Sequence, residues 1–118
     1  MYKISKQFSF SAAHSLYGLP DNHPCTRLHG HNYVVTIHLK SEILNETGFV
    51  KDYNELNLIK QYIDTNIDHK KLNDIMHPLN SSAENIAKML YDTFKPLIPE
   101  LYAVEVSETP KTSAIYEP

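Results

Sequence analysis

Two stretches near the start of the sequence alternate apolar and polar side chains with a period of two, and this pattern constrains the fold more than any other feature. Residues two apart on a β-strand point to the same face, so strict alternation gives one apolar face and one polar face. The apolar face of the first stretch carries Ile4, Phe8, Phe10 and Ala12 and ends at His14. The apolar face of the second stretch carries His29, His31, Tyr33, Val35, Ile37 and Leu39. Both stretches are therefore predicted to be strands with one buried face.

Histidines stand at one end of each predicted apolar face. If the two strands pair antiparallel, as sequential strands often do, His14 at the end of the first lies near His29 and His31 at the start of the second. Three imidazoles then converge beside the connecting loop, residues 15–28. Neutral imidazole suits Zn²⁺, and three protein ligands leave a fourth position for water or substrate, as in catalytic zinc sites. Iron, copper and nickel also accept imidazole, so the histidines predict a metal site without deciding the metal.

Two other interpretations of these histidines stay open. A His-x-His pair such as His29 and His31 also occurs as ordinary hydrogen-bonded histidines, although a third histidine on the same predicted face favours a metal. Cys25, in the loop between the strands, could supply a fourth ligand and close the site. The open three-histidine site predicts a zinc enzyme, and the closed site predicts a zinc-stabilised binding module without catalysis.

Length, charge and cysteine content limit the class of protein. With 118 residues and 42% hydrophobic content, the chain can bury one core, so residues 1–118 are expected to form a single domain. A formal net charge of −3 provides no global attraction to nucleic acid or to an anionic membrane, and neither is an expected partner. One cysteine excludes an intrachain disulfide and suits a reducing cytoplasm. We recognise no signal peptide and no apolar run of membrane-spanning length.

Two helices and two more strands are predicted downstream. Capping pairs mark the helix starts, Asp52 with Glu55 and Ser81 with Glu84. Apolar residues at helical spacing follow each pair, namely Leu56, Ile59 and Ile63, and then Ile86, Met89, Leu90 and Phe94. Residues 104–107 alternate again, and residues 114–116 can form a last strand after a turn at Pro110. This order predicts an α+β fold, a four-stranded antiparallel sheet with two helices on one face.

Four charged or titratable residues outside the histidine cluster are candidates for chemistry. Asp68 precedes His69, and an aspartate can orient an imidazole that moves protons. Adjacent side chains often diverge, however, and taken alone the pair is better explained by an ordinary loop. Glu108 ends the apolar row of its predicted strand, where a carboxylate needs a partner or a ligand to offset desolvation, unless it lies at an exposed strand end. Arg27, the only arginine, could contact a phosphate group or could be an exposed charge.

The arrangement of these motifs resembles the superfamily of 6-pyruvoyltetrahydropterin and 6-carboxytetrahydropterin synthases. The matching segments are Phe8 to His14, Cys25-x-x-x-His29-Gly30-His31, Asp68-His69, Ser82-Ala83-Glu84-Asn85 and Glu108-Thr109. They span nearly the whole chain. The three residues between Cys25 and His29 are similar to the spacing in the 6-carboxytetrahydropterin synthases of queuosine biosynthesis. Ala83 departs from the second hydroxyl or polar residue that is usual in this family.

The resemblance implies a tunnelling fold whose subunits join into a barrel, commonly a hexamer made of two trimers with active sites at the subunit interfaces. It implies zinc on the three histidines, with Cys25 as the proton acceptor. It further implies that Asp68 and His69 activate this cysteine across an interface, that Glu108 anchors a pterin, and that Ser82 lies near it.

The implied reaction is a redox-neutral lyase reaction on a pterin. 7,8-Dihydroneopterin triphosphate would be converted to 6-carboxy-5,6,7,8-tetrahydropterin with release of acetaldehyde and triphosphate. Zinc polarises substrate hydroxyls as a Lewis acid, and a thiolate can move the proton. Related enzymes that stop at the pyruvoyl product, or act as pterin aldolases, are alternatives within the family.

Overall fold

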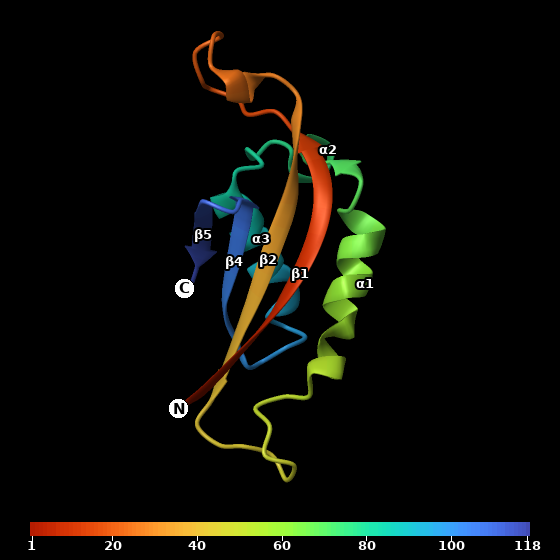
Figure 1. The fold of residues 1–118 in the computed structure, drawn as a ribbon, viewed down its shortest axis with the longest axis vertical. Helices are drawn as coiled ribbons and strands as arrows, with labels where there is room; N and C mark the ends of the chain where they lie inside the picture. The colour runs from red at the N-terminus through yellow and green to blue at the C-terminus, as the bar shows by residue number, and fades with distance from the viewer.

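The computed structural model describes all 118 residues and shows an α+β architecture built on one sheet (Figure 1). The strands are β1 (Tyr2–His14), β2 (His29–Ser41), β3 (Lys70–Lys71), β4 (Leu101–Thr109) and β5 (Thr112–Tyr116). The α-helices are α1 (Asn57–Asn66), α2 (Leu72–Met76) and α3 (Ala83–Phe94), and the 3-10 helices are η1 (Pro24–Thr26) and η2 (Tyr53–Leu56). None of the helices has the length and apolar character needed to cross a membrane.

The predicted antiparallel pairing of the first two strands is confirmed. Their register places His14 opposite His29 and Ala12 opposite His31. Alternate residues of both strands are buried, among them Phe8, Phe10 and Val35. They pack with the helices into one hydrophobic cluster. The two predicted apolar faces are therefore one continuous surface of the sheet.

The sheet differs from the predicted four antiparallel strands. It has five strands in the order β3-β1-β2-β4-β5, and β3 runs parallel to β1, so the sheet is mixed. β3 consists of Lys70 and Lys71, which pair with Ala12 and Ala13. Two exposed lysines have no apolar alternation, and tertiary contacts alone place them beside β1. The pattern-based prediction could not find such a strand.

The helices also depart from the prediction in number and in one start. The cap at Asp52 is confirmed, because its carboxylate accepts a hydrogen bond from the Asn54 N–H at 2.9 Å, and the 3-10 turn η2 precedes α1. The second predicted helix, α3, is capped by Ser82 and not by Ser81. The short helix α2 is a third helix that the sequence did not predict, because five residues are too few to show a helical period.

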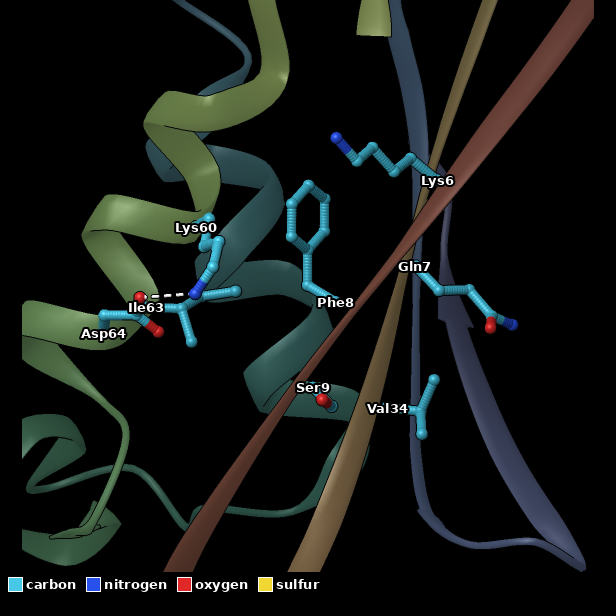
Figure 2. Close-up of a pocket in the computed structure, with 8 residues that line it drawn as sticks. All are labelled: Lys6, Gln7, Phe8, Ser9, Val34, Lys60, Ile63 and Asp64. Carbon is cyan, nitrogen blue, oxygen red and sulfur yellow. Dashed lines mark hydrogen bonds and ion pairs between the residues drawn. The ribbon is translucent and has the colours of Figure 1, made fainter. Parts of the chain in front are cut away.

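The outer edge of β1 is open along most of its length. β3 covers only Ala12 and Ala13, so no strand of the chain pairs with the outward backbone groups of residues 2–10. A pocket of about 490 Å³ lies along this edge beside α1 (Figure 2). In it Phe8 points toward α1, whereas Gln7 points to the opposite side of the sheet. Ser5, Gln7 and Ser9 are exposed, so this opposite face of β1 is polar, as predicted.

Candidate metal centre and adjoining pocket

Three histidines converge at one end of the sheet, as the strand pattern predicted. One ligand atom from each of His14, His29 and His31 lies within 4.8 Å of the other two, so all three can reach a single ion. The distances between ring centroids are 4.6 Å for His14 and His29, 5.2 Å for His14 and His31, and 4.9 Å for His29 and His31. Because the ligands come from the paired ends of β1 and β2, the backbone hydrogen bonds of the sheet fix their spacing.

Hydrogen bonds to the outer ring nitrogens prepare two of these histidines to bind a metal. The Nδ1 atom of His14 lies 2.8 Å from the Ser81 carbonyl oxygen, and that of His29 lies 2.7 Å from the Arg27 carbonyl oxygen. A carbonyl can only accept, so each Nδ1 carries the proton and each Nε2 keeps a free lone pair. The Nε2 atom of His31 is buried and has no hydrogen-bond partner. An orphaned buried nitrogen beside two free lone pairs fits a cation in this site.

The surroundings of the site keep His14 neutral, which is the form that binds a metal. His14 is only 1% exposed. Burial lowers its pKa and outweighs the hydrogen bond to the Ser81 carbonyl, which raises it. The Tyr33 hydroxyl lies 3.4 Å from both ring nitrogens of His14. Burial also raises the pKa of Tyr33, so the site has a protonated phenol at its base.

Glu108 connects the histidine cluster to a neighbouring pocket. Its Oε2 atom lies 3.6 Å from the Nε2 atom of His31. The same residue lines a pocket of about 380 Å³ together with Ser82 and Leu16. The structure thus brings two residues with predicted substrate roles, Glu108 and Ser82, into one cavity. Ser82 also caps α3, where its hydroxyl oxygen accepts from the Asn85 N–H at 3.2 Å and its own proton stays free to donate.

Cys25 lies outside the histidine cluster. It is a half-buried free thiol on η1, in the loop that extends beyond the ends of β1 and β2 (Figure 1). Its N–H donates to the Nδ1 atom of His23 at 3.1 Å, and its carbonyl oxygen accepts from the Leu16 N–H at 2.8 Å. The group of close ligand atoms contains the three histidines and not this thiol. This arrangement counts against the closed site in which Cys25 is the fourth ligand.

Asp68 and His69 are held against the edge of β1 by an unusual backbone conformation. The Asp68 carboxylate accepts from the Ser11 N–H and lies 2.9 Å from the Nδ1 atom of His69, and the His69 N–H donates to the Ser11 carbonyl. These bonds hold His69 at φ 60°, in the left-handed region, which few residues other than glycine adopt. The Ser11 N–H, followed by the His69 side chain, holds the pKa of Asp68 below its usual value. Asp68 therefore stays ionised and orients an exposed imidazole.

The remaining predicted residue, Arg27, has an exposed side chain that forms no ion pair with any acidic residue of the chain. Its only contribution to the histidine cluster is its backbone carbonyl, which accepts from His29. Within one chain, Cys25 forms no hydrogen bond with Asp68 or His69. The structure brings Glu108 within 3.6 Å of His31 and places Ser82 in the same pocket as Glu108, and it leaves Cys25 and His69 as separate groups.

Sequence reasoning missed two residues of the site. Ser81 is fully buried, and both its carbonyl and its hydroxyl lie within hydrogen-bond distance of the Nδ1 atom of His14, at 2.8 and 3.1 Å. No local pattern connects two residues so far apart in the sequence. The second is Tyr33, which the strand pattern places only in the apolar row. Its place two residues after His31 on the same strand face is the signal that indicates a hydroxyl near the metal site.

Comparisons with known proteins identify related chains along the full length. The family described as 6-pyruvoyl tetrahydropterin synthase matches residues 3–118. The 6-carboxy-5,6,7,8-tetrahydropterin synthase of Synechocystis is 34% identical, over 98% of this chain and 93% of its own. Human 6-pyruvoyl tetrahydrobiopterin synthase is 33% identical, over 98% of this chain and 90% of its own. The structure of Caenorhabditis elegans 6-pyruvoyl tetrahydropterin synthase has a TM-score of 0.88 at 28% identity, covering 99% of this chain and 95% of that one.

The histidine cluster leads to a first prediction, on metal content. His29→Ala removes one of three ligands from strands that stay paired, so we expect the variant to retain the fold and to lose most of its bound zinc. Metal analysis of the purified protein, with circular dichroism as the check on folding, measures this. The matched control is His38→Ala, which changes a histidine further along β2 that is bonded to Glu105 at 3.2 Å. Stoichiometric zinc in the His29→Ala protein would refute the assignment.

Proposed function

This chain belongs to the 6-pyruvoyl tetrahydropterin synthase family, and we propose that it is a zinc-dependent lyase acting on 7,8-dihydroneopterin triphosphate. The proposed reaction consumes one water and gives 6-carboxy-5,6,7,8-tetrahydropterin, acetaldehyde and triphosphate, a step of queuosine biosynthesis. Relatives named as carboxytetrahydropterin synthases, at 34% and 29% identity, support this assignment. A pyruvoyl synthase is the second candidate, because relatives with that name also reach 34% identity. We also propose a cytoplasmic location, because a chain with a single cysteine suits a reducing compartment.

The observation that carries this proposal is the contact between the metal cluster and the Glu108 pocket. Glu108 lies 3.6 Å from His31 and also lines the pocket that contains Ser82. A pterin bound to Glu108 through its amino-pyrimidine edge would thus have its side chain next to the three histidines. A zinc-stabilised binding module would not require a carboxylate-lined pocket beside an orphaned ligand nitrogen.

We assign the chemistry to four side chains and one metal. Zinc on His14, His29 and His31 would supply Lewis-acid polarisation of the substrate hydroxyls. The Glu108 carboxylate accepts two adjacent N–H groups of the pterin and so orients the ring. The Cys25 thiolate takes the proton from the substrate side chain. His69, oriented by ionised Asp68, exchanges that proton with the thiol.

We further propose that several copies of the chain complete the site. Cys25 and His69 do not meet within one chain, so a second copy can bring its His69 to the Cys25 of the first. The sheet offers a route to such an assembly, because β1 has an unpaired outer edge and β5 is the outermost strand on the other side. Pairing one edge with the other edge of the next copy closes a ring of sheets. A barrel of three copies, doubled to a hexamer, is the proposed state.

Product analysis tests the proposed reaction. Zinc-loaded protein is incubated with 7,8-dihydroneopterin triphosphate, and the pterin products and acetaldehyde are identified by mass spectrometry. We expect 6-carboxytetrahydropterin together with acetaldehyde. A pyruvoyl pterin without acetaldehyde would support the second candidate, and unchanged substrate would support the binding module.

A second prediction separates the proton acceptor from the metal site. Cys25→Ala removes the thiol without removing a metal ligand, so we expect zinc content, fold and pterin binding to persist while turnover is lost. His69→Asn should give a milder loss of turnover, since His69 acts through the thiol. Asparagine is chosen because it tolerates the left-handed conformation that His69 adopts. Steady-state kinetics and metal analysis measure both effects. Loss of zinc from Cys25→Ala would instead indicate a cysteine ligand.

A third prediction concerns the pterin anchor. Glu108→Gln keeps the shape of the side chain and replaces one acceptor oxygen by a donor, so one of the two hydrogen bonds to the pterin is lost. We expect binding to weaken by about 2–3 kcal/mol, on the order of a hundredfold, with zinc content unchanged. Titration calorimetry with a non-reacting pterin measures the affinity. Glu105→Gln, on the same strand but paired with His38, is the control. Equal affinity of Glu108→Gln and the parent protein would remove the anchoring role.

A fourth prediction tests the assembly through the open strand edge. The backbone N–H and C=O groups of Gln7 face the outer edge of β1, as those of Ser9 and Ser11 do. Gln7→Pro removes one outward N–H, which an edge strand tolerates but a paired strand does not. We expect this variant to sediment as a smaller species than the parent protein in analytical ultracentrifugation. Gln7→Ala keeps the N–H and should retain the assembly. A parent protein that sediments as a monomer would refute the proposed ring.

A further inference from the structure

The loop that carries Cys25 has few attachments to the rest of the molecule. Residues 15–28 connect His14 to His29 and make several hydrogen bonds among themselves, including that between Leu16 and Cys25. All hydrogen bonds that join this loop to residues beyond 14–29 are made by the side chains of Asn73 and Asn80. The exposed side chains of Tyr17 and Leu28 provide little apolar anchoring. Two amide side chains therefore attach the loop to the body of the protein.

Asn73 binds the first loop residue as a neighbouring strand would. Its Oδ1 atom accepts from the Ser15 N–H at 2.9 Å, and its Nδ2 atom donates to the Ser15 carbonyl at 2.8 Å. The Nδ2 atom also donates to the Tyr17 hydroxyl at 2.9 Å. Asn73 is only 7% exposed, so water does not replace these bonds readily when they are lost.

Asn80 repeats the arrangement two residues further along the loop. Its Oδ1 atom accepts from the Tyr17 N–H at 2.7 Å, and its Nδ2 atom donates to the Tyr17 carbonyl at 3.1 Å. The backbone of Asn80 is held in turn, because its carbonyl accepts from the Asn85 side chain on α3 at 2.9 Å. Asn73 and Asn80 together form a clamp on the loop. The clamp is anchored in α2 through Asn73 and just before α3 through Asn80.

The residue between the two clamped positions is Leu16, and it belongs to the site. Leu16 lines the pocket that contains Glu108 and Ser82. Its N–H donates to the Cys25 carbonyl at 2.8 Å, so it also holds the backbone of the thiol-bearing turn. Fixing the residues on both sides of Leu16 therefore sets the wall of the pocket and the position of Cys25 together.

We propose that Asn73 and Asn80 are positioning residues, which hold Leu16 against the Glu108 pocket and hold the Cys25 turn relative to the three histidines. The three histidines keep their places in the paired strands, and His14 keeps its own bonds to Ser81. The two asparagines therefore act mainly on the loop, whose one bond to a histidine of the cluster is the Arg27 carbonyl that accepts from His29. The effect of the clamp on catalysis rests on the proposed function, whereas its effect on the loop does not.

Asn73→Ala and Asn80→Ala test this role in the zinc-loaded full-length protein. We expect amide hydrogen exchange in residues 15–28, and the rate of Cys25 alkylation by iodoacetamide, to rise on the order of tenfold in each variant, with zinc content unchanged. In turnover assays, displacement of Cys25 should lower kcat and displacement of Leu16 should raise KM. Asn80→Ala keeps the test available if the more buried Asn73→Ala does not fold.

Met76→Ala is the matched control, because it weakens the same helix, α2, at a side chain only 6% exposed that makes no hydrogen bond to the loop. Met76→Ala should lower the free energy of unfolding of the whole protein without a selective increase in amide hydrogen exchange in residues 15–28. An equal increase in Met76→Ala, or unchanged exchange and alkylation in both asparagine variants, would overturn the proposal. A parent protein that forms no pterin product, while its asparagine variants still show the loop changes, would contradict the proposed function and support the positioning role.

Discussion

The register between β1 and β2 is the constraint on which the rest of the structure depends. It places His14 opposite His29 and Ala12 opposite His31. Side chains alternate between the two faces of a strand, so a shift by one residue would turn the histidines of one strand to the polar face. The same shift would expose Phe8 and Phe10, which are buried in the core. The hydrophobic effect that buries the core and the geometry of the metal site therefore favour the same register.

The histidine cluster combines an apolar setting with one charged neighbour. Burial keeps His14 neutral, and the carbonyls of Ser81 and Arg27 fix which ring nitrogen of His14 and His29 carries the proton. The one carboxylate close to the cluster is Glu108, 3.6 Å from His31. A cation in the cluster would lower the electrostatic free energy of a carboxylate at this distance. A bound metal and the Glu108 carboxylate thus stabilise each other.

Sequence alone was sufficient for the parts of this protein that follow a local period. Strand parity predicted the convergence of His14, His29 and His31, and it placed Glu108 at the end of the buried row of β4. It could not predict β3 or the helix α2, because two and five residues are too short to show a period. It could not predict Ser81 or Asn73 as partners of the first strand and its loop, because those contacts join residues more than fifty positions apart. Tertiary packing alone brings such residues together.

The residues of the proposed reaction are divided between two kinds of backbone. The three histidines lie on the paired strands β1 and β2, whose ladder fixes their spacing, and Glu108 lies on β4 at the register shift between Val106 and Thr109. Cys25 lies on a loop held by two asparagines, and His69 lies in a strained turn held by Ser11. Paired strands resist displacement, whereas a loop or turn moves when a few hydrogen bonds are lost. Metal binding and proton transfer should therefore respond most strongly to different substitutions, since strand pairing places the histidines, whereas side-chain hydrogen bonds hold the Cys25 loop. The Arg27 carbonyl, which accepts from His29, is the one bond between that loop and the histidine cluster.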